Sequence, residues 1–365
     1  MQEGIDAGQR LGLKSVAPQV GVLFNTWQDR IASNVKTFVR GPSLDSTPTL
    51  HVAITFFDSS SSKRRSSRLK PDQPLAKVMY QRIRFRKPAR LRSQLDRWGQ
   101  LASVLRGLCS IDWMRLEITI FSNAAPDRFE GIRAMLLCFP HAQFRVAYVD
   151  DGILDHPYEL AWSHRQVLSQ LVATMGENDM YLYLEDDEAF SAENLKYFNS
   201  MLRLTSARGL IPSFMRIEFN ETGRYWVSSD LVTSASHALP PSFEIPDLNI
   251  SFIELPNPYC GLYLLDRTLA MEFVASPVFV EATNHFRDWG LRERAASGLL
   301  YHNPPEGFNT RGVVAFHSDS GLPVGGALVH HLGNVYANDE TMGYGNFRVD
   351  GDMLHSLSRS AVHGE

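Results

Sequence analysis

The sequence predicts an α/β fold in which a mostly parallel central sheet is flanked by helices and followed by a mixed second half. Near-continuous apolar runs recur in the first half, at residues 51–58, 116–122, 144–149 and 180–184. Helical patterns separate these runs, and the pattern becomes irregular and Pro-rich after about residue 210. Apolar strands that alternate with helices are typical of a parallel sheet covered on both faces, with right-handed crossovers.

The four runs have the residue types of buried strands. The first, His51–Asp58, is rich in β-branched and aromatic residues and ends in an acid, and the fourth, Met180–Leu184, leads directly into a series of carboxylates. Short apolar runs of this kind suit strands that are buried on both faces.

Two segments between the runs have apolar residues at helical spacing. They cover Leu91–Leu108 and Pro157–Thr174, where Pro157 suits the first helical turn and Gly176 suits a C-terminal stop. In the second half, short β-like pieces are separated by Pro-rich loops, and a helix is expected over about Pro277–Leu300. We divide the chain into an extension (1–50), an α/β half (51–210), a mixed half (211–345) and a tail (346–365), and we expect no separable second domain.

The charge is unevenly distributed. Between Lys63 and Arg97 there are thirteen Lys or Arg residues and two acids, so this basic block carries about +11, against a net charge of −4 for the chain. Such a block can bind a phosphate-bearing ligand, an anionic membrane surface or nucleic acid. We favour a solvated loop followed by a basic helix face, because the tract Ser59–Ser67 has no apolar anchor.

The compartment is predicted from the cysteines and from the N-terminus. Three cysteines without paired spacing build no disulfide framework. The first residues include acids where a signal peptide needs an apolar core, and no window reaches eighteen apolar residues. We expect a cytoplasmic protein whose membrane contact, if any, is peripheral, at the inner face and through the basic block. We expect no nucleic-acid partner.

The strongest motif is the acidic quartet Glu185-Asp186-Asp187-Glu188, which directly follows an apolar strand and precedes a helix that begins near Ser191. In an open parallel sheet, ligands bind at the carboxyl ends of the strands. Four adjacent negative charges repel one another, and a divalent cation removes that penalty. Carboxylates suit Mg²⁺ or Mn²⁺, which complete their coordination with substrate phosphates. The alternative is a solvated acidic turn that favours the following helix N-terminus.

The residues Leu184-Glu185-Asp186-Asp187, followed by an aromatic residue and the helix Glu193–Phe198, resemble the acidic, DXD-like motif of glycosyltransferases with the GT-A fold. The Glu-Asp-Asp form is similar to that of the N-acetylglucosaminyltransferase I group. The resemblance covers about residues 51–200 well and extends more loosely to about 340. It implies a GT-A-like, Rossmann-type sheet, with a donor-binding half (51–210) and an acceptor-side half (211–345).

The same resemblance implies a glycosyltransferase (EC 2.4 class) that uses Mn²⁺ or Mg²⁺. Such an enzyme transfers a sugar from a nucleotide-diphosphate sugar to a hydroxyl of a glycan or lipid-linked acceptor, as in polysaccharide biosynthesis. By this resemblance Asp187 is the metal ligand, and Glu185 and Asp186 serve the donor. A C-terminal histidine commonly adds a further metal ligand in this fold; His331 is favoured over His330.

Further donor residues are expected after the third strand and on the following helix. Asp150 and Asp151 stand where this fold places an acid near the base or ribose, although an Asp-Gly turn explains them equally. Arg165 suits either a carboxylate or a diphosphate. On the acceptor side, Glu293 is the first candidate for the general base and Asp288 the second. Arg292 replaces one acid of the pair that the family usually has there, and helix surface charge is the alternative.

Two other functions stay open. A metal-dependent nucleotidyl or phosphoryl transferase also needs clustered carboxylates on a parallel sheet. A non-catalytic anion-binding scaffold could use the 63–97 basic block. The sequence does not determine the sugar, the nucleotide, the acceptor, the oligomeric state, or whether the sugar is transferred with inversion or retention.

Overall fold

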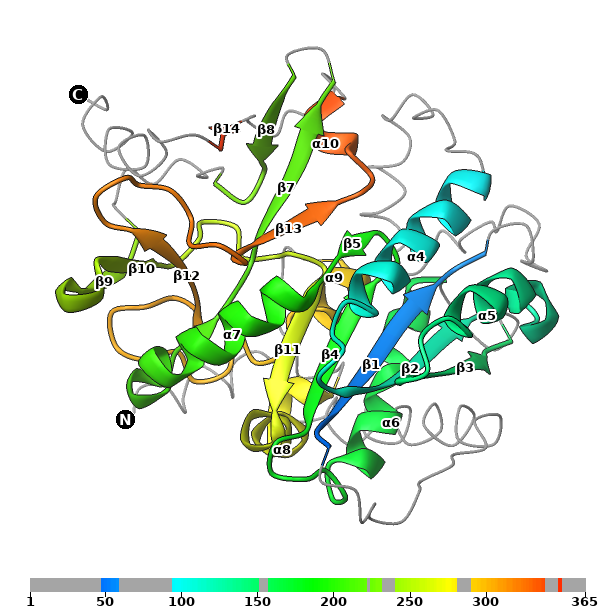
Figure 1. The fold of residues 1–365 in the computed structure, drawn as a ribbon. Helices are drawn as coiled ribbons and strands as arrows, with labels where there is room; N and C mark the ends of the chain where they lie inside the picture. The colour runs from blue at the N-terminus through cyan, green and yellow to red at the C-terminus, as the bar shows by residue number, and fades with distance from the viewer. Residues whose placement is uncertain are drawn as a thin grey trace, which may run out of the picture.

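The computed structural model describes residues 47–58, 94–150, 157–221, 224–231, 240–280, 290–338 and 347–349. Figure 1 shows three sheets with helices packed around them. The largest parallel run is formed by the first half of the chain, and the later strands are mixed. The predicted α/β class is therefore confirmed.

The first sheet has the strand order β11-β4-β1-β2-β3, in which the first four strands of the sequence are parallel and β11 is antiparallel to β4. Its strands are β1 (Thr49–Phe56), β2 (Arg115–Ser122), β3 (Ala142–Tyr148), β4 (Met180–Glu185) and β11 (Leu262–Asp266). The four predicted strands are confirmed to within two residues at each end.

The two faces of this sheet differ in chemistry. One face is aliphatic and aromatic: Phe56 packs against Trp98 of α4 (Gln94–Leu108), with ring centroids 4.6 Å apart. The other face carries Tyr181, Tyr183 and Tyr263, and it is covered by α6 (His164–Leu171) and α8 (Arg267–Ala275). On this face His164 is fully buried and bonds the Tyr263 hydroxyl at 2.6 Å. His164 is thus a core histidine.

The second half forms two further sheets. One has the order β6-β12-β10-β9 and the other the order β14-β8-β7-β13-β5. Their strands are β6 (Ile211–Pro212), β12 (Gly312–His317), β10 (Ile250–Ile253), β9 (Ser242–Ile245), β14 (Phe347–Arg348), β8 (Tyr225–Ser228), β7 (Met215–Asn220), β13 (Leu328–His331) and β5 (Glu188–Ala189). The strand β5 matters most here. It begins with Glu188, the last acid of the quartet, and it joins the first half of the chain to a sheet of the second half.

The other helices connect these strands. The α-helices are α5 (Glu130–Leu136), α7 (Ala192–Thr205), α9 (Leu291–Ala295) and α10 (Val335–Asn338). The 3-10 turns are η2 (Pro126–Phe129), η4 (Pro157–Trp162), η5 (Ser206–Arg208), η6 (Pro246–Leu248) and η7 (Pro277–Phe279). As Figure 1 shows, α7 follows β5 directly.

Two predicted helices differ from the structure. The segment Pro157–Thr174 is split into η4 and α6, with the break at Ser163. Of the helix expected over 277–300, the described residues form only the short η7 and the five residues of α9. In η7 the carbonyls of Val278 and Phe279 accept hydrogen bonds from the buried side chain of Arg165.

Among the described helices, none has the length and apolar character needed to cross a bilayer. Of the basic block, only residues 94–97 lie in the described part of the chain. Its contact with a membrane or a phosphate ligand therefore stays a prediction.

Candidate functional site

The first two acids of the quartet direct their side chains to opposite sides of the first sheet: Glu185 is the last residue of β4, and Asp186 lies in the turn that follows. Glu185 shares a face with Thr55, its register partner on β1. Its Oε1 accepts a 2.5 Å hydrogen bond from the Tyr259 hydroxyl and lies 3.5 Å from Arg292 Nε. Asp186 turns to the α4 side, where both of its oxygens accept from Arg97 Nη2, at 2.9 and 2.6 Å.

Both of these carboxylates are buried and compensated by an arginine. Burial raises the pKa of Asp186 to about 6, although the Arg97 charge opposes the rise. Burial likewise raises the pKa of Glu185, against the charge of Arg292. Arg97 is itself held in place, because its Nη1 donates to the Phe57 carbonyl at 2.9 Å. The first half of the quartet is therefore fixed in two ion pairs.

These two ion pairs border a cavity of about 110 Å³ at the carboxyl ends of β1 and β4. Besides the four charged side chains, its lining includes Thr55 and Tyr158. The guanidinium of Arg292 lies over the Tyr158 ring, 5.7 Å from its centroid. We call this cavity the arginine pocket. It combines two cationic groups with an aromatic surface at the sheet edge where ligands of open α/β sheets bind.

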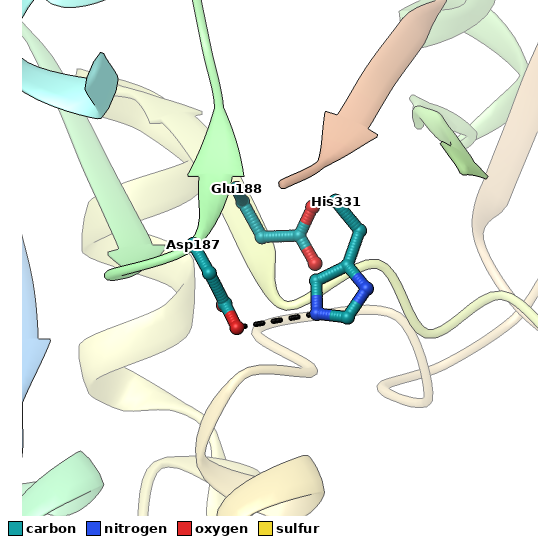
Figure 2. A group of neighbouring side chains, drawn as sticks. All are labelled: Asp187, Glu188 and His331. Carbon is teal, nitrogen blue, oxygen red and sulfur yellow. Dashed lines mark hydrogen bonds and ion pairs between the residues drawn. The ribbon is translucent and has the colours of Figure 1, made fainter. Parts of the chain in front are cut away.

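The second half of the quartet meets His331. Asp187, Glu188 and His331 each offer one ligand atom, and these atoms all lie within 4.8 Å of one another. Figure 2 shows the three side chains converging, with the dashed line joining Asp187 to His331. His331 Nε2 lies 3.2 Å from Asp187 Oδ2. The antiparallel pairing of β5 with β13 places Glu188 directly opposite His331.

Glu188 is the most unusual group in this cluster. Its side chain is fully buried, and neither of its carboxyl oxygens has a hydrogen-bond partner among the described residues. Burial raises the pKa of Glu188 well above its ordinary value, although His331 and Arg216 oppose the rise. A buried carboxylate without partners is costly unless it is paired or coordinates a metal. Two carboxylates and an imidazole form a donor set that suits a divalent ion such as Mn²⁺.

The carboxylates around His331 and the imidazole shift each other's pKa. Burial alone lowers the pKa of His331, but the carboxylates of Asp187, Glu188 and Glu218 raise it well above the usual range. Asp187 responds in the opposite direction: burial raises its pKa, but His331 outweighs this and holds it well below the ordinary value. The cluster thus keeps Asp187 ionised and oriented towards the imidazole.

Gly261 closes the back of the cluster. Its φ is +71°, and a Cβ built there would lie 3.0 Å from Glu188 Oε1 and 3.4 Å from Glu185 Cδ. The carbonyl of Gly261 accepts from the Glu185 backbone N–H at 3.0 Å. A residue with a side chain would therefore crowd the two acids and strain the backbone.

The remaining predicted residues are scattered. Arg165 is buried, its guanidinium 4.0 Å from the Trp162 ring centroid and bonded to the Phe279 and Ala295 carbonyls. This arrangement gives Arg165 a structural part in packing α6. Asp150 follows β3 at the same sheet edge, three strand spacings of about 4.8 Å from β4. Asp151 and Asp288 lie outside the described residues.

Glu293 lies on α9, one residue from the pocket residue Arg292. Its Oε2 is buried and has no hydrogen-bond partner in the described part of the chain. Its negative charge contributes, after the Arg292 and Asp187 charges, to the electrostatic environment of Glu185. Its role as a base stays a prediction.

The sequence placed Glu188 in the acidic quartet without giving it a role of its own, because its strand pairing with His331 could not be seen. It did not indicate Glu218, Arg97 or Tyr259 as site residues. Glu218 and Tyr259 had no signal, because a single acid in a strand and a tyrosine in a Pro-rich loop are common without function.

Comparison with known proteins gives only distant structural likenesses. No family model and no curated protein sequence matches the chain. Among solved structures it is similar to the apo form of WbbM, a bifunctional glycosyltransferase, with a TM-score of 0.35 and 10% identity, over 76% of this chain and 40% of that one. It is also similar to the apo form of mouse xyloside xylosyltransferase 1, with a TM-score of 0.33 and 12% identity, over 72% and 84% of the two chains. The chain thus spans less than half the length of WbbM. Both of these proteins are glycosyltransferases by description.

Proposed function

We propose that this chain is a metal-dependent glycosyltransferase, which transfers a sugar from a nucleotide-diphosphate donor to a hydroxyl of a glycan or lipid-linked acceptor. One observation carries the proposal: Asp187, Glu188 and His331 converge at the end of β4, and the buried Glu188 carboxylate has no partner among the described residues. The likeness of the Glu-Asp-Asp sequence to the GT-A motif supports the choice of reaction.

In this proposal Asp187, Glu188 and His331 hold the divalent cation, Mn²⁺ or Mg²⁺. The bound cation supplies positive charge to the diphosphate leaving group. Asp187 is already ionised in the absence of metal, because His331 lowers its pKa. Glu188 is placed by β5 so that its carboxylate gains the cationic partner it otherwise lacks. The protein residues therefore form the cluster before the cation binds.

In this proposal the arginine pocket contacts the phosphates of the donor. Arg97 and Arg292 line it, and each is oriented by one acid of the quartet, Asp186 or Glu185. Guanidinium groups bind phosphate oxygens through pairs of N–H donors. Because Arg97 and Arg292 line this pocket and Arg165 does not, we assign the donor contact to these two arginines. Asp150 and Asp151 remain candidates for the ribose or base.

The acceptor hydroxyl loses its proton to Glu293, or to Asp288 in the second choice, if the enzyme inverts configuration. Glu293 fits this part because its buried Oε2 is not occupied by another hydrogen bond among the described residues. A general base must reach the attacking hydroxyl directly or through one water.

Thermal-shift measurements test the proposal. We expect Mn²⁺ together with UDP or GDP to raise the melting temperature of the full chain more than either component alone. The Asp187→Ala variant should lose this response, whereas Asp247→Ala, which removes an exposed aspartate, should keep it.

A screen of nucleotide-sugar hydrolysis then identifies the donor. A metal response with nucleoside triphosphates and release of pyrophosphate would replace the proposal by a nucleotidyl transferase. Polyanion binding that ignores both metal and Asp187 would replace it by an anion-binding scaffold.

A further inference from the structure

We propose that Glu218 is a positioning residue that fixes the imidazole of His331 in the tautomer and orientation needed for metal binding. The inference rests on the proposed metal centre, but its geometry can be tested without metal. Glu218 lies on β7, and only 3% of its surface is exposed. One carboxyl oxygen, Oε1, contacts His331 Nδ1, and the other, Oε2, accepts the Ala337 backbone N–H at 2.7 Å.

Both oxygens of Glu218 are therefore engaged, and by groups on the two elements that carry and follow the histidine. His331 ends β13, and Ala337 lies in α10. A carboxylate held at both oxygens cannot rotate away from the ring. The imidazole is consequently clamped at Nδ1, and its Nε2 is directed towards Asp187.

The segment 331–338 is tied to the end of β7 by further hydrogen bonds to Phe219 and Asn220, the two residues after Glu218. Asn334 Oδ1 accepts the Phe219 N–H at 2.8 Å, Asn220 Nδ2 donates to the Ala337 carbonyl at 2.7 Å, and Asn338 Nδ2 donates to the Phe219 carbonyl at 2.8 Å. These contacts hold the backbone that carries the histidine. Glu218 is the member of the set that reaches the ring itself.

The burial of the two carboxylates decides which ring nitrogen keeps the proton. The side chain of Glu218 is 4% exposed and that of Asp187 is 23% exposed. A hydrogen bond is stronger in the less polar, more buried environment. In the neutral ring, the proton therefore stays on Nδ1, facing Glu218, and Nε2 presents its lone pair towards Asp187 and Glu188. Carboxylates that orient a ligating histidine in this way raise its metal affinity.

The variant Glu218→Gln tests the inference in the full chain. The substitution keeps the shape of the side chain, but an amide cannot accept from both His331 Nδ1 and the Ala337 N–H. We expect the affinity for Mn²⁺ alone, measured by electron paramagnetic resonance of free Mn²⁺, to fall by about 10- to 100-fold. The matched control is Glu221→Gln, the same chemical change on an exposed side chain just after β7, and it should bind Mn²⁺ like the wild type.

Nitrogen-15 chemical shifts of His331 in the metal-free protein give a readout that a general loss of stability does not change. At a pH where the ring is neutral, the wild type should show the Nδ1–H tautomer, and Glu218→Gln should show a mixture of tautomers. Unchanged Mn²⁺ affinity in Glu218→Gln, or a wild-type ring protonated at Nε2, would overturn the inference. If the variant does not fold, the wild-type shifts alone decide it. A wild type that binds no Mn²⁺ would sink the proposed function, and the tautomer would still decide the role of Glu218.

Discussion

Glu188 and His331 lie directly opposite each other in the antiparallel pair formed by β5 and β13. A two-residue strand is short, and here it places a fully buried carboxylate beside an imidazole that comes from the far end of the described chain. Directly opposed residues in such a pair have Cβ atoms about 5 Å apart, which is within reach of a shared ion. The contact is thus set by backbone pairing and does not depend on a mobile side chain.

The variant Glu188→Gln should stabilise the metal-free protein while abolishing Mn²⁺ binding. Burial raises the pKa of Glu188 well above its ordinary value of 4.5, so the folded state retains a proton that the unfolded chain releases. Folding stability of the wild type therefore falls as pH rises above about 4.5, and the glutamine variant escapes this loss. We expect a gain of about 1–3 kcal/mol at pH 7, measured by urea denaturation in EDTA.

Whether Glu188→Gln raises or lowers the stability of the metal-free protein shows whether Glu188 serves metal binding or stabilises the fold. A variant that is less stable than the wild type at every pH, in EDTA, would show that Glu188 has a stabilising partner and would contradict the prediction.

Gly261→Ala should cost more stability than Gly209→Ala, although both glycines have nearly the same φ, +71° and +72°. An alanine in this left-handed region costs about 1–2 kcal/mol at either position. At residue 209 there is nothing within 4 Å of the new Cβ, whereas at residue 261 it meets the Glu188 side chain at 3.0 Å. Crowding adds about 1–3 kcal/mol at residue 261 and displaces Glu188. Equal stabilities and equal Mn²⁺ affinities for the two variants would refute this.

Arg97 and Asp186 should behave as a coupled pair. Removal of Arg97 leaves a buried carboxylate without its bidentate partner, so Arg97→Gln should lower stability by about 3 kcal/mol, near the low end for buried pairs. The double variant Arg97→Gln with Asp186→Asn should recover part of this loss. A double-mutant cycle in chemical denaturation measures the coupling, and strictly additive losses would show that the pair is not coupled.

Asp179, just before the amino-terminal end of β4, makes a pH-dependent contribution to folding stability. Burial raises its pKa, but the imidazole of His51, 3.9 Å away, and hydrogen bonds from the Thr49 and Gly176 N–H groups outweigh this and lower it to about 2. Its contribution is thus complete above about pH 4 and is lost as pH falls towards 2. Asp179→Asn should therefore lose about 1–2 kcal/mol at pH 7 and much less near pH 2.5.

The neighbouring exposed acid offers the control for this measurement. Glu177→Gln should change stability little at either pH. An Asp179→Asn penalty that stayed constant from pH 7 to pH 2.5 would mean that its charge is not what stabilises the fold.

Local sequence patterns predicted the first sheet well, because β1, β2 and β4 are buried over most of their length and their apolar runs are therefore conspicuous. The same logic located the acids at the end of β4, where a strand leads into a turn. It also favoured His331, which the structure brings to 3.2 Å from Asp187; the metal role of both residues stays a prediction.

Long-range contacts were beyond that reasoning. No local pattern shows that Glu188 enters a second sheet, or that Glu218 reaches the ring of a histidine more than a hundred positions later. Arg165 illustrates the opposite case: its sequence position suggested a ligand contact, but the main-chain carbonyls of Val278 and Phe279 take its donors. Such competition between a ligand and the backbone is visible only in three dimensions.

The separation of Asp187 and His331, 144 positions along the chain, has a consequence for protein synthesis. A ribosome adds roughly 5–20 residues per second, so the acids leave the exit tunnel on the order of ten seconds before the imidazole. During that interval the nascent chain holds the anionic half of the centre alone. An ion that requires all three side chains can therefore bind only after synthesis has passed His331, and it cannot nucleate the folding of the chain before that point.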